Sequence, residues 1–175
     1  MSTILVAYAT KNGSTREVAE AIGAVALAAG AEVEVTTAHS VTGPVSGTDL
    51  LVLGAPIYSG RWHRDAHRFL KRHRRELAGM PVAVFALGPR RDDEEAWQHS
   101  WKQLHRALAK RVWLHPVAVG LFGGADPAGR GRAARRDLRD WTAIGDWARS
   151  FLAPAPAIGA AAQPARVPGP GAQSW

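Results

Sequence analysis

The residues best suited to chemistry lie in one short segment that follows an apolar run from Ile4 to Ala9: Thr10, Lys11, Asn12, Gly13, Ser14 and Thr15. A helical pattern begins near Ser14. The first N–H groups of a helix have no partner within the helix, and the helix dipole adds positive potential there. The hydroxyls of Thr10, Ser14 and Thr15 can donate further bonds. Gly13 allows close approach of the backbone or a positive φ. The segment therefore predicts a site for an anion, and we interpret it as a phosphate cradle.

The same residues also fit an ordinary helix start. Glu17 follows Ser14 by three residues, which is the spacing of a capping box. The residues alone leave both interpretations open. Lys11 and Arg16 would add Coulombic attraction to a bound phosphate, although Arg16 fits a solvent-facing helical position equally well.

The elements that must position this segment alternate between strand and helix. Continuous or alternating apolar patterns predict strands at residues 3–9, 32–36, 50–55, 81–87 and 112–122. Helical spacing predicts helices at residues 14–29, 62–77, 94–110 and 141–151. Pro116 indicates an edge position or a bulge in the last strand. We expect an α/β fold with a five-stranded parallel sheet and helices on both faces.

Composition limits the possible function classes. The chain has 175 residues, 46% of them hydrophobic, and no cysteine, which excludes disulfides and thiolate chemistry. The net charge of +7 and a pI near 10.7 favour anionic partners. Much of the charge lies between Arg61 and Arg75 and between Arg130 and Arg139. We expect no nucleic-acid binding, because aromatic residues are not interleaved with these cations. The Pro-, Ala- and Gly-rich residues 154–175 predict a disordered tail after a domain at 1–153.

Three families with this alternation of strands and helices do not fit the sequence. The chain has no Gly-rich dinucleotide fingerprint and no P-loop motif. A response regulator needs acidic residues after its first strand, where this chain has Ala9 and Thr10, and a phosphoacceptor Asp at the end of its third, where it has Ala55 and Pro56.

Two segments resemble flavodoxins. Thr10, Gly13 and Thr15 are similar to the flavodoxin phosphate loop, and residues 52–60 resemble the first isoalloxazine loop, in which a Gly-x-Pro-x-Tyr/Trp-x-x-Gly pattern is usual. The resemblance implies a doubly wound sheet of order 2-1-3-4-5 with FMN at the carboxyl ends of its strands. It implies a phosphate site at residues 10–15 and ring contacts from Pro56, Ile57, Tyr58, Ser59 and Gly60, with Leu87, Gly88 and Pro89 on the other side.

Residues 8–17, 54–63, 123–127 and 139–148 narrow the resemblance to the subfamily that contains menaquinone-dependent protoporphyrinogen dehydrogenase. Members with that activity usually carry a longer, partly helical stretch where this chain has only Gly124 to Arg139. The resemblance therefore supports FMN binding better than it supports porphyrinogen oxidation.

Individual side chains carry alternatives. Tyr58 fits a ring contact or a surface residue packed on its own loop. Trp62 fits a shield for the flavin edge or a core residue. His63 and His67 have the spacing of a metal pair, but no acidic or cysteine ligand completes it, so we expect no metal site. Core packing accounts for a set of tryptophans at helical spacing: Trp97, Trp101, Trp141 and Trp147.

The first functional hypothesis is an FMN-dependent oxidoreductase that passes electrons from a small organic substrate, with a porphyrinogen as the implied example, to a quinone-type acceptor. No residue is assigned a catalytic role. The alternatives are a flavodoxin-type electron carrier and a cofactor-free interaction domain. We expect a cytoplasmic protein, with peripheral contact to the inner face of the membrane as an option for the basic helix after Arg61. The oligomeric state is left open.

Overall fold

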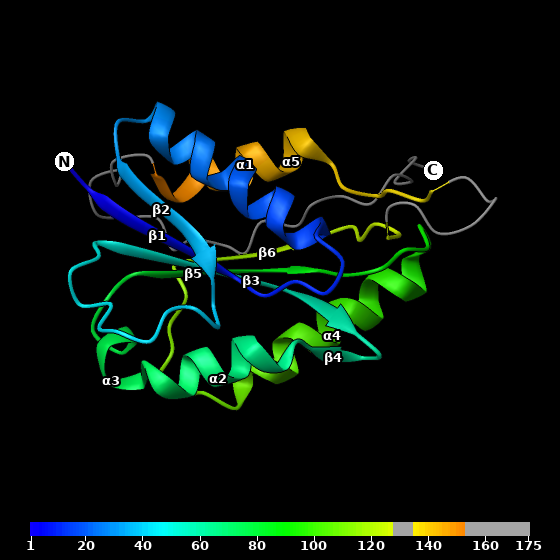
Figure 1. The fold of residues 1–175 in the computed structure, drawn as a ribbon. Helices are drawn as coiled ribbons and strands as arrows, with labels where there is room; N and C mark the ends of the chain where they lie inside the picture. Colours follow the sequence, from blue (N-terminus) through cyan, green and yellow to red (C-terminus); the bar gives the residue numbers. More distant parts are fainter. Residues whose placement is uncertain (128–134, 153–175) are drawn as a thin grey trace, which may run out of the picture.

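A parallel sheet forms the centre of the computed structural model, which describes residues 1–127 and 135–152 (Figure 1). Its strands, in the order in which they lie side by side, are β2 (Glu32–Thr37), β1 (Thr3–Tyr8), β3 (Leu50–Tyr58), β5 (Val82–Leu87) and β6 (Ala118–Phe122). All four pairings between them are parallel. The predicted five-stranded order 2-1-3-4-5 is confirmed.

Helices cover both faces of the sheet, as predicted (Figure 1). One face is covered by α1 (Ser14–Ala28) and α5 (Trp141–Leu152). The other carries α2 (Arg64–Arg72), α3 (Arg74–Leu77) and α4 (Glu94–Ala109). Long connections allow these five strands to run in the same direction. The sheet is consequently buried between two hydrophobic layers.

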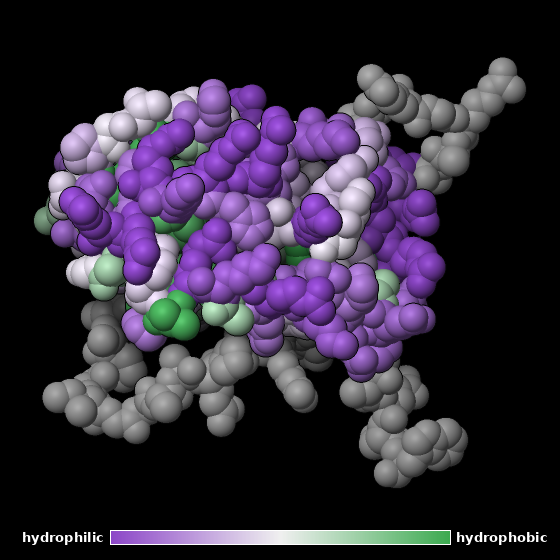
Figure 2. All heavy atoms as spheres, turned by 90° about the horizontal axis from the view of Figure 1, so that it is seen from below, coloured by the Kyte–Doolittle hydropathy of each residue, from purple (hydrophilic) through white to green (hydrophobic). Residues whose placement is uncertain are grey.

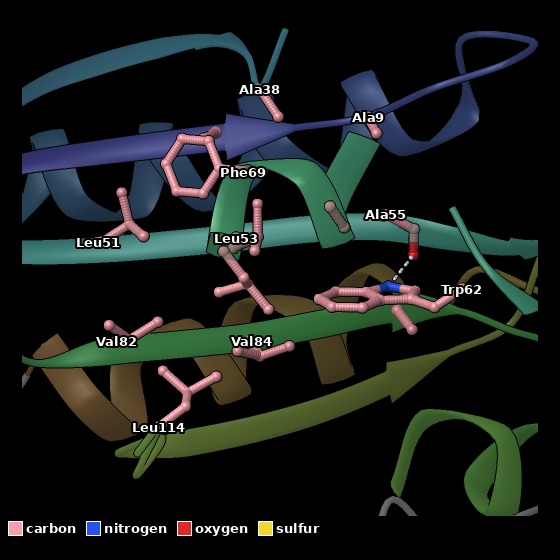
Figure 3. Close-up of a cluster of buried hydrophobic side chains, with 14 of the residues drawn as sticks. Ala9, Ala38, Leu51, Leu53, Ala55, Trp62, Phe69, Val82, Val84 and Leu114 are labelled. Atoms are coloured by element: carbon pink, nitrogen blue, oxygen red, sulfur yellow. Dashed lines mark hydrogen bonds between the residues drawn. The ribbon is translucent and has the colours of Figure 1, made fainter. Parts of the chain in front are cut away.

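The layer beneath α2, α3 and α4 is built from side chains that alternate along the central strands. Leu51, Leu53, Val82 and Val84 point into it and belong to one buried cluster with Phe69 of α2 (Figure 3). The opposite layer packs Val52 and Phe85 against α1 and α5. Period-two alternation of fully apolar strands is what places large side chains on both faces.

The structure corrects the predicted elements around Trp62. Strand β3 continues three residues past Ala55 and turns back as β4 (Arg61–Trp62), which pairs antiparallel with its end. Trp62 is therefore a strand residue, and the helix begins only at Arg64. Trp62 is 2% exposed and its indole N–H donates to the Ala55 carbonyl (Figure 3), so its core interpretation is correct.

Two further predictions need correction. The last strand is shorter than expected, because β6 begins only at Ala118, two residues after Pro116, a residue that cannot donate to a sheet. It lies at the edge of the sheet, as the proline indicates. Trp141 is 46% exposed and is not a core residue, whereas Trp147 is buried beside Phe85 and Phe122.

The predicted tail, residues 154–175, lies outside the described residues. Within 1–127 and 135–152, no helix combines the length and apolar character that a membrane crossing requires.

Candidate functional site at the carboxyl ends of the strands

The turn between β1 and α1 has the conformation of an anion cradle. Gly13 is the residue that precedes the helix, and its φ of 89° lies in the left-handed region. Its N–H donates to the Thr10 hydroxyl at 2.9 Å, which closes the turn back on itself. No side chain within residues 1–127 and 135–152 caps the helix, so the capping box predicted as an alternative is not formed there. Ser14 is already the first helical residue, one position too late to act as its cap.

Thr15 tests whether a phosphate fits this turn. The side chain is fully buried, and its hydroxyl has no hydrogen-bond partner among the described residues. A buried hydroxyl without a partner is costly, so native structures usually satisfy such groups. The first N–H groups of α1, beside it, have no acceptor within the helix. A phosphate dianion would satisfy both kinds of donor, and the turn therefore fits the phosphate of FMN.

The predicted ring loop is the tip of a β-hairpin. Tyr58 of β3 pairs with Arg61 of β4, and only Ser59 and Gly60 connect them. Their φ values are 49° and 71°, the two positive values that a type I′ turn requires. Pro56 and Ile57 are half-buried at the end of β3, and Tyr58 beyond them is 39% exposed. The hairpin holds this aromatic side chain at the carboxyl edge of the sheet.

Lys11 connects the hairpin to the phosphate turn. Its ammonium lies 3.9 Å from the centre of the Tyr58 ring. The guanidinium of Arg90, from the loop after β5, lies 6.0 Å from the same ring. Contact with Lys11, and then the charge of Arg90, lowers the pKa of the Tyr58 phenol. Three loops that are separate in the sequence thus meet at one exposed aromatic side chain.

The third predicted loop is held mainly by its own bonds. The Gly88 N–H donates to the Phe122 carbonyl at 2.8 Å, and the Pro89 carbonyl accepts from Gly124 at 2.7 Å. Leu87 is 2% exposed and packs in the layer beneath α1 and α5. A ring contact from this loop would therefore use the surface of Gly88 and Pro89 or share these backbone groups. The assignment of all three residues stays a prediction.

Other candidate side chains take ordinary structural roles. Arg16 pairs with Glu20 at 2.7 Å on the exposed side of α1, which agrees with the predicted solvent-facing position. Asn12 is exposed in the phosphate turn. His63 accepts from the Asp65 N–H at the start of α2. His67 contacts the Arg111 guanidinium at 2.9 Å. No group of three potential metal ligands occurs in the described parts of the chain.

Sequence reasoning assigned no contact to Arg139, although it is one of the few buried charged residues described. Its guanidinium donates to both carboxylate oxygens of Asp137, to the Glu17 carboxylate and to the Ser14 carbonyl. The last two partners are in the first turn of α1, more than 120 residues earlier. The available signal was the motif Arg139-Asp140-Trp141, which has no chemistry of its own.

Comparison with known proteins is consistent with this geometry. The model of a family described as "Flavodoxin domain" matches residues 5–127, which contain both the phosphate turn and the hairpin. A curated relative from Escherichia coli strain K12, protoporphyrinogen IX dehydrogenase (quinone), is 30% identical over 84 residues, which are 47% of this chain and 46% of that protein. The chain thus spans about half the length of the curated relatives it matches.

Solved structures agree on the architecture. Oxidised flavodoxin 1 from Bacillus cereus superimposes with a TM-score of 0.59 at 20% identity, over 86% of this chain and 97% of that one. Oxidised flavodoxin 2 from the same organism gives a TM-score of 0.55 at 22% identity, over 86% and 95% of the two chains. At these identities the likeness concerns the fold.

Proposed function

As the chain belongs to the flavodoxin domain family and its cofactor is FMN, we propose that it is an FMN-dependent oxidoreductase that moves electrons from a reduced organic substrate to a quinone-type acceptor. One observation carries the proposal: Lys11 joins the phosphate turn to the Tyr58 hairpin at the carboxyl edge of the sheet. Crevices at this edge, beside the point where strand order reverses, are where open α/β sheets bind such ligands.

The site residues divide the work of holding the cofactor. The turn at residues 10–15 would hold the phosphate through backbone N–H groups, the Thr15 hydroxyl and the charge of Lys11. The tip of the hairpin, Pro56 to Gly60, would lie against the flavin, with the exposed Tyr58 ring as its main contact. Gly88 and Pro89 would flank the other side. When bound, FMN supplies the exchange of hydride and electrons, and the protein orients it.

Charge around the hairpin favours an anionic substrate. Arg61 follows the tip directly and is exposed, and Arg90 lies beside Tyr58. Cations next to a binding site raise the local concentration of anions and speed their association. A porphyrinogen carries carboxylates and fits this requirement. The curated relatives act as protoporphyrinogen dehydrogenases by name, which also supports a porphyrinogen substrate and a quinone acceptor.

The α4 helix brings two polar side chains close to the hairpin tip. A Cβ atom at Gly60 would lie 3.7 Å from the Gln103 amide nitrogen and 4.0 Å from the His99 Nε2. His99 and Gln103 also contact each other at 3.2 Å. In the proposed enzyme these side chains line the approach to the flavin edge and are available to bind a substrate.

Two other functions stay open to test. A single-electron carrier of the flavodoxin type would dock on a partner protein, but its docking partners are generally basic, and this chain carries a net charge of +7. A cofactor-free interaction domain would use its arginines against an acidic partner. The buried Thr15 hydroxyl, which has no partner within the described part of the chain, favours an FMN-loaded protein over such a domain.

The test is a turnover assay with the FMN-loaded protein. Protoporphyrinogen IX is supplied with a menaquinone analogue, and porphyrin formation is followed by fluorescence under anaerobic conditions. We expect turnover that requires FMN and weakens as salt is added, because screening reduces attraction to the carboxylates. FMN-loaded protein without turnover would exclude this substrate pair.

We further propose that residues 1–153 form the FMN-binding domain and that the protein acts in the cytoplasm, with peripheral contact to the inner face of the membrane as an option.

A further inference from the structure

The buried Arg139 connects a late segment of the chain to the start of α1. The segment is itself anchored: the Leu138 N–H donates to the Gly124 carbonyl at 3.0 Å, and Ala125 and Asp137 form an antiparallel bridge. Asp137 binds the guanidinium through two hydrogen bonds, at 2.9 and 2.6 Å. This bidentate contact fixes the plane and direction of the guanidinium. The third nitrogen is left to face α1.

That third nitrogen acts on the peptide group between Ser14 and Thr15. It donates to the Ser14 carbonyl at 3.2 Å. In a trans peptide the carbonyl and the following N–H point in opposite directions, so a cation that holds the Ser14 oxygen directs the Thr15 N–H toward the open end of the helix. Hydrogen bonds in a chain also polarise one another, which strengthens this N–H as a donor. Thr15 therefore presents its N–H and its hydroxyl, which no described residue contacts by a hydrogen bond, from one oriented residue.

The same nitrogen also donates to the Glu17 carboxylate. Glu17 is the acidic residue in the first turn of α1, and a negative charge there would repel a phosphate dianion. Arg139 compensates that charge from within the protein. Trp141 covers the guanidinium, whose centre lies 4.8 Å from its ring, and the Arg139 side chain is 3% exposed. Low exposure limits screening by salt.

We propose that Arg139, held by Asp137, is a positioning residue for phosphate recognition, which orients the Ser14–Thr15 peptide and neutralises Glu17 so that the turn accepts a dianion. The inference rests on the proposed FMN site. It predicts that Arg139 distinguishes FMN from riboflavin, which has the same ring system and no phosphate. A residue that only supported the fold would affect both flavins alike.

The experiment titrates the apo-protein with FMN and with riboflavin and follows the quenching of flavin fluorescence. We expect Arg139→Gln to weaken FMN binding about tenfold or more and to change riboflavin binding less than about twofold. The double variant Glu17→Gln/Arg139→Gln should recover part of the lost FMN affinity. Arg149→Gln removes an exposed arginine that pairs with Asp146 at 2.6 Å and is the matched control, with both affinities unchanged.

Glu17→Gln alone covers the case in which Arg139→Gln does not fold. It should strengthen FMN binding severalfold and leave riboflavin binding unchanged, because only the dianion experiences the lost carboxylate. Equal effects of Arg139→Gln on both flavins, or no effect on FMN, would overturn the proposal, and so would a Glu17→Gln variant with unchanged FMN affinity. If the native chain binds neither flavin, the proposed function itself fails, and the two failures are thereby distinguished.

Discussion

Thr15 carries its hydroxyl into the protein without a partner among the described residues, whereas most buried polar groups are bonded. At the scale of single residues, such a group marks a place where stability has been given up for binding. Lys11 and Tyr58 lie at the same end of the sheet, where an exposed cation contacts an exposed aromatic ring. The site is built from a few residues that are suboptimal in the absence of a ligand.

Replacement of Thr15 by valine should separate stability from binding. In valine a methyl group of similar shape replaces the unsatisfied hydroxyl. The free energy of unfolding of the apo-protein should therefore stay unchanged or rise by up to about 1 kcal/mol. FMN affinity should fall about tenfold, since a charge-assisted hydrogen bond is lost. Chemical denaturation and flavin titration measure the two quantities. Thr142→Val, at an exposed position of α5, is the control. A large loss of apo-protein stability would show that the hydroxyl has a protein partner.

Gly13 should be sensitive for a backbone reason alone. Its φ is 89°, but a Cβ atom would meet nothing within 4 Å. Gly13→Ala should therefore cost about 1–2 kcal/mol of unfolding free energy through the left-handed conformation, with no steric clash. Gly79→Ala is the matched control, because a Cβ there also meets nothing and no positive φ is involved. Equal stabilities of the two variants in urea denaturation would contradict the required conformation.

At the scale of elements, Gly54 of β3 leaves room for the ring of Phe85, its partner residue on β5, where β3 leads into the hairpin. A Cβ atom at Gly54 would lie 1.9 Å from the Phe85 ring, which is fully buried. Gly54→Ala should cost more than the roughly 1–3 kcal/mol typical of overpacking, since the ring has no free volume to enter. Thermal unfolding of this variant, with Gly47→Ala as a control in open space, tests it. A melting temperature equal to that of the control would show that the ring relocates at little cost.

The periodicity of the sequence predicted most of the elements, because buried parallel strands and amphipathic helices leave strong patterns. It failed at Trp62, whose spacing to Ala66 and Phe69 is helical although the residue lies in a strand. Ser59 and Gly60 both have a positive φ, as a type I′ turn requires, but serine is not a residue whose type predicts that conformation. The contact between Arg139 and Glu17 spans more than 120 residues, and no local pattern encodes it.

At the scale of the whole molecule, charge is distributed unevenly over a hydrophilic surface. The face covered by α2, α3 and α4 is predominantly hydrophilic, with scattered apolar residues (Figure 2). Helix α2 alone exposes four cations: Arg64, Arg68, Lys71 and Arg72. Such a field acts on the association of anions and not on the fold itself.

The stability of the molecule should depend on pH through His67. Burial, and then the neighbouring Arg111 and Lys110, lower the pKa of His67 below its ordinary value of 6.5. His67 therefore binds a proton more readily in the unfolded chain than in the folded protein. The folded state is consequently most favoured above pH 6.5 and loses stability as the pH falls below that value. Urea denaturation at pH 7.5 and 5.5 should show a smaller decrease for His67→Gln than for the native chain. His105→Gln, at an exposed position, should retain the native decrease.

FMN binding is tested most directly by the visible absorption spectrum of the purified protein, recorded after incubation with FMN and removal of the excess. The bound flavin is then released by heat and identified. We predict a flavin spectrum shifted from that of free FMN, and release of about one FMN per chain. A colourless protein that cannot be loaded with FMN would contradict a phosphate-binding turn beside a flavin-binding tyrosine.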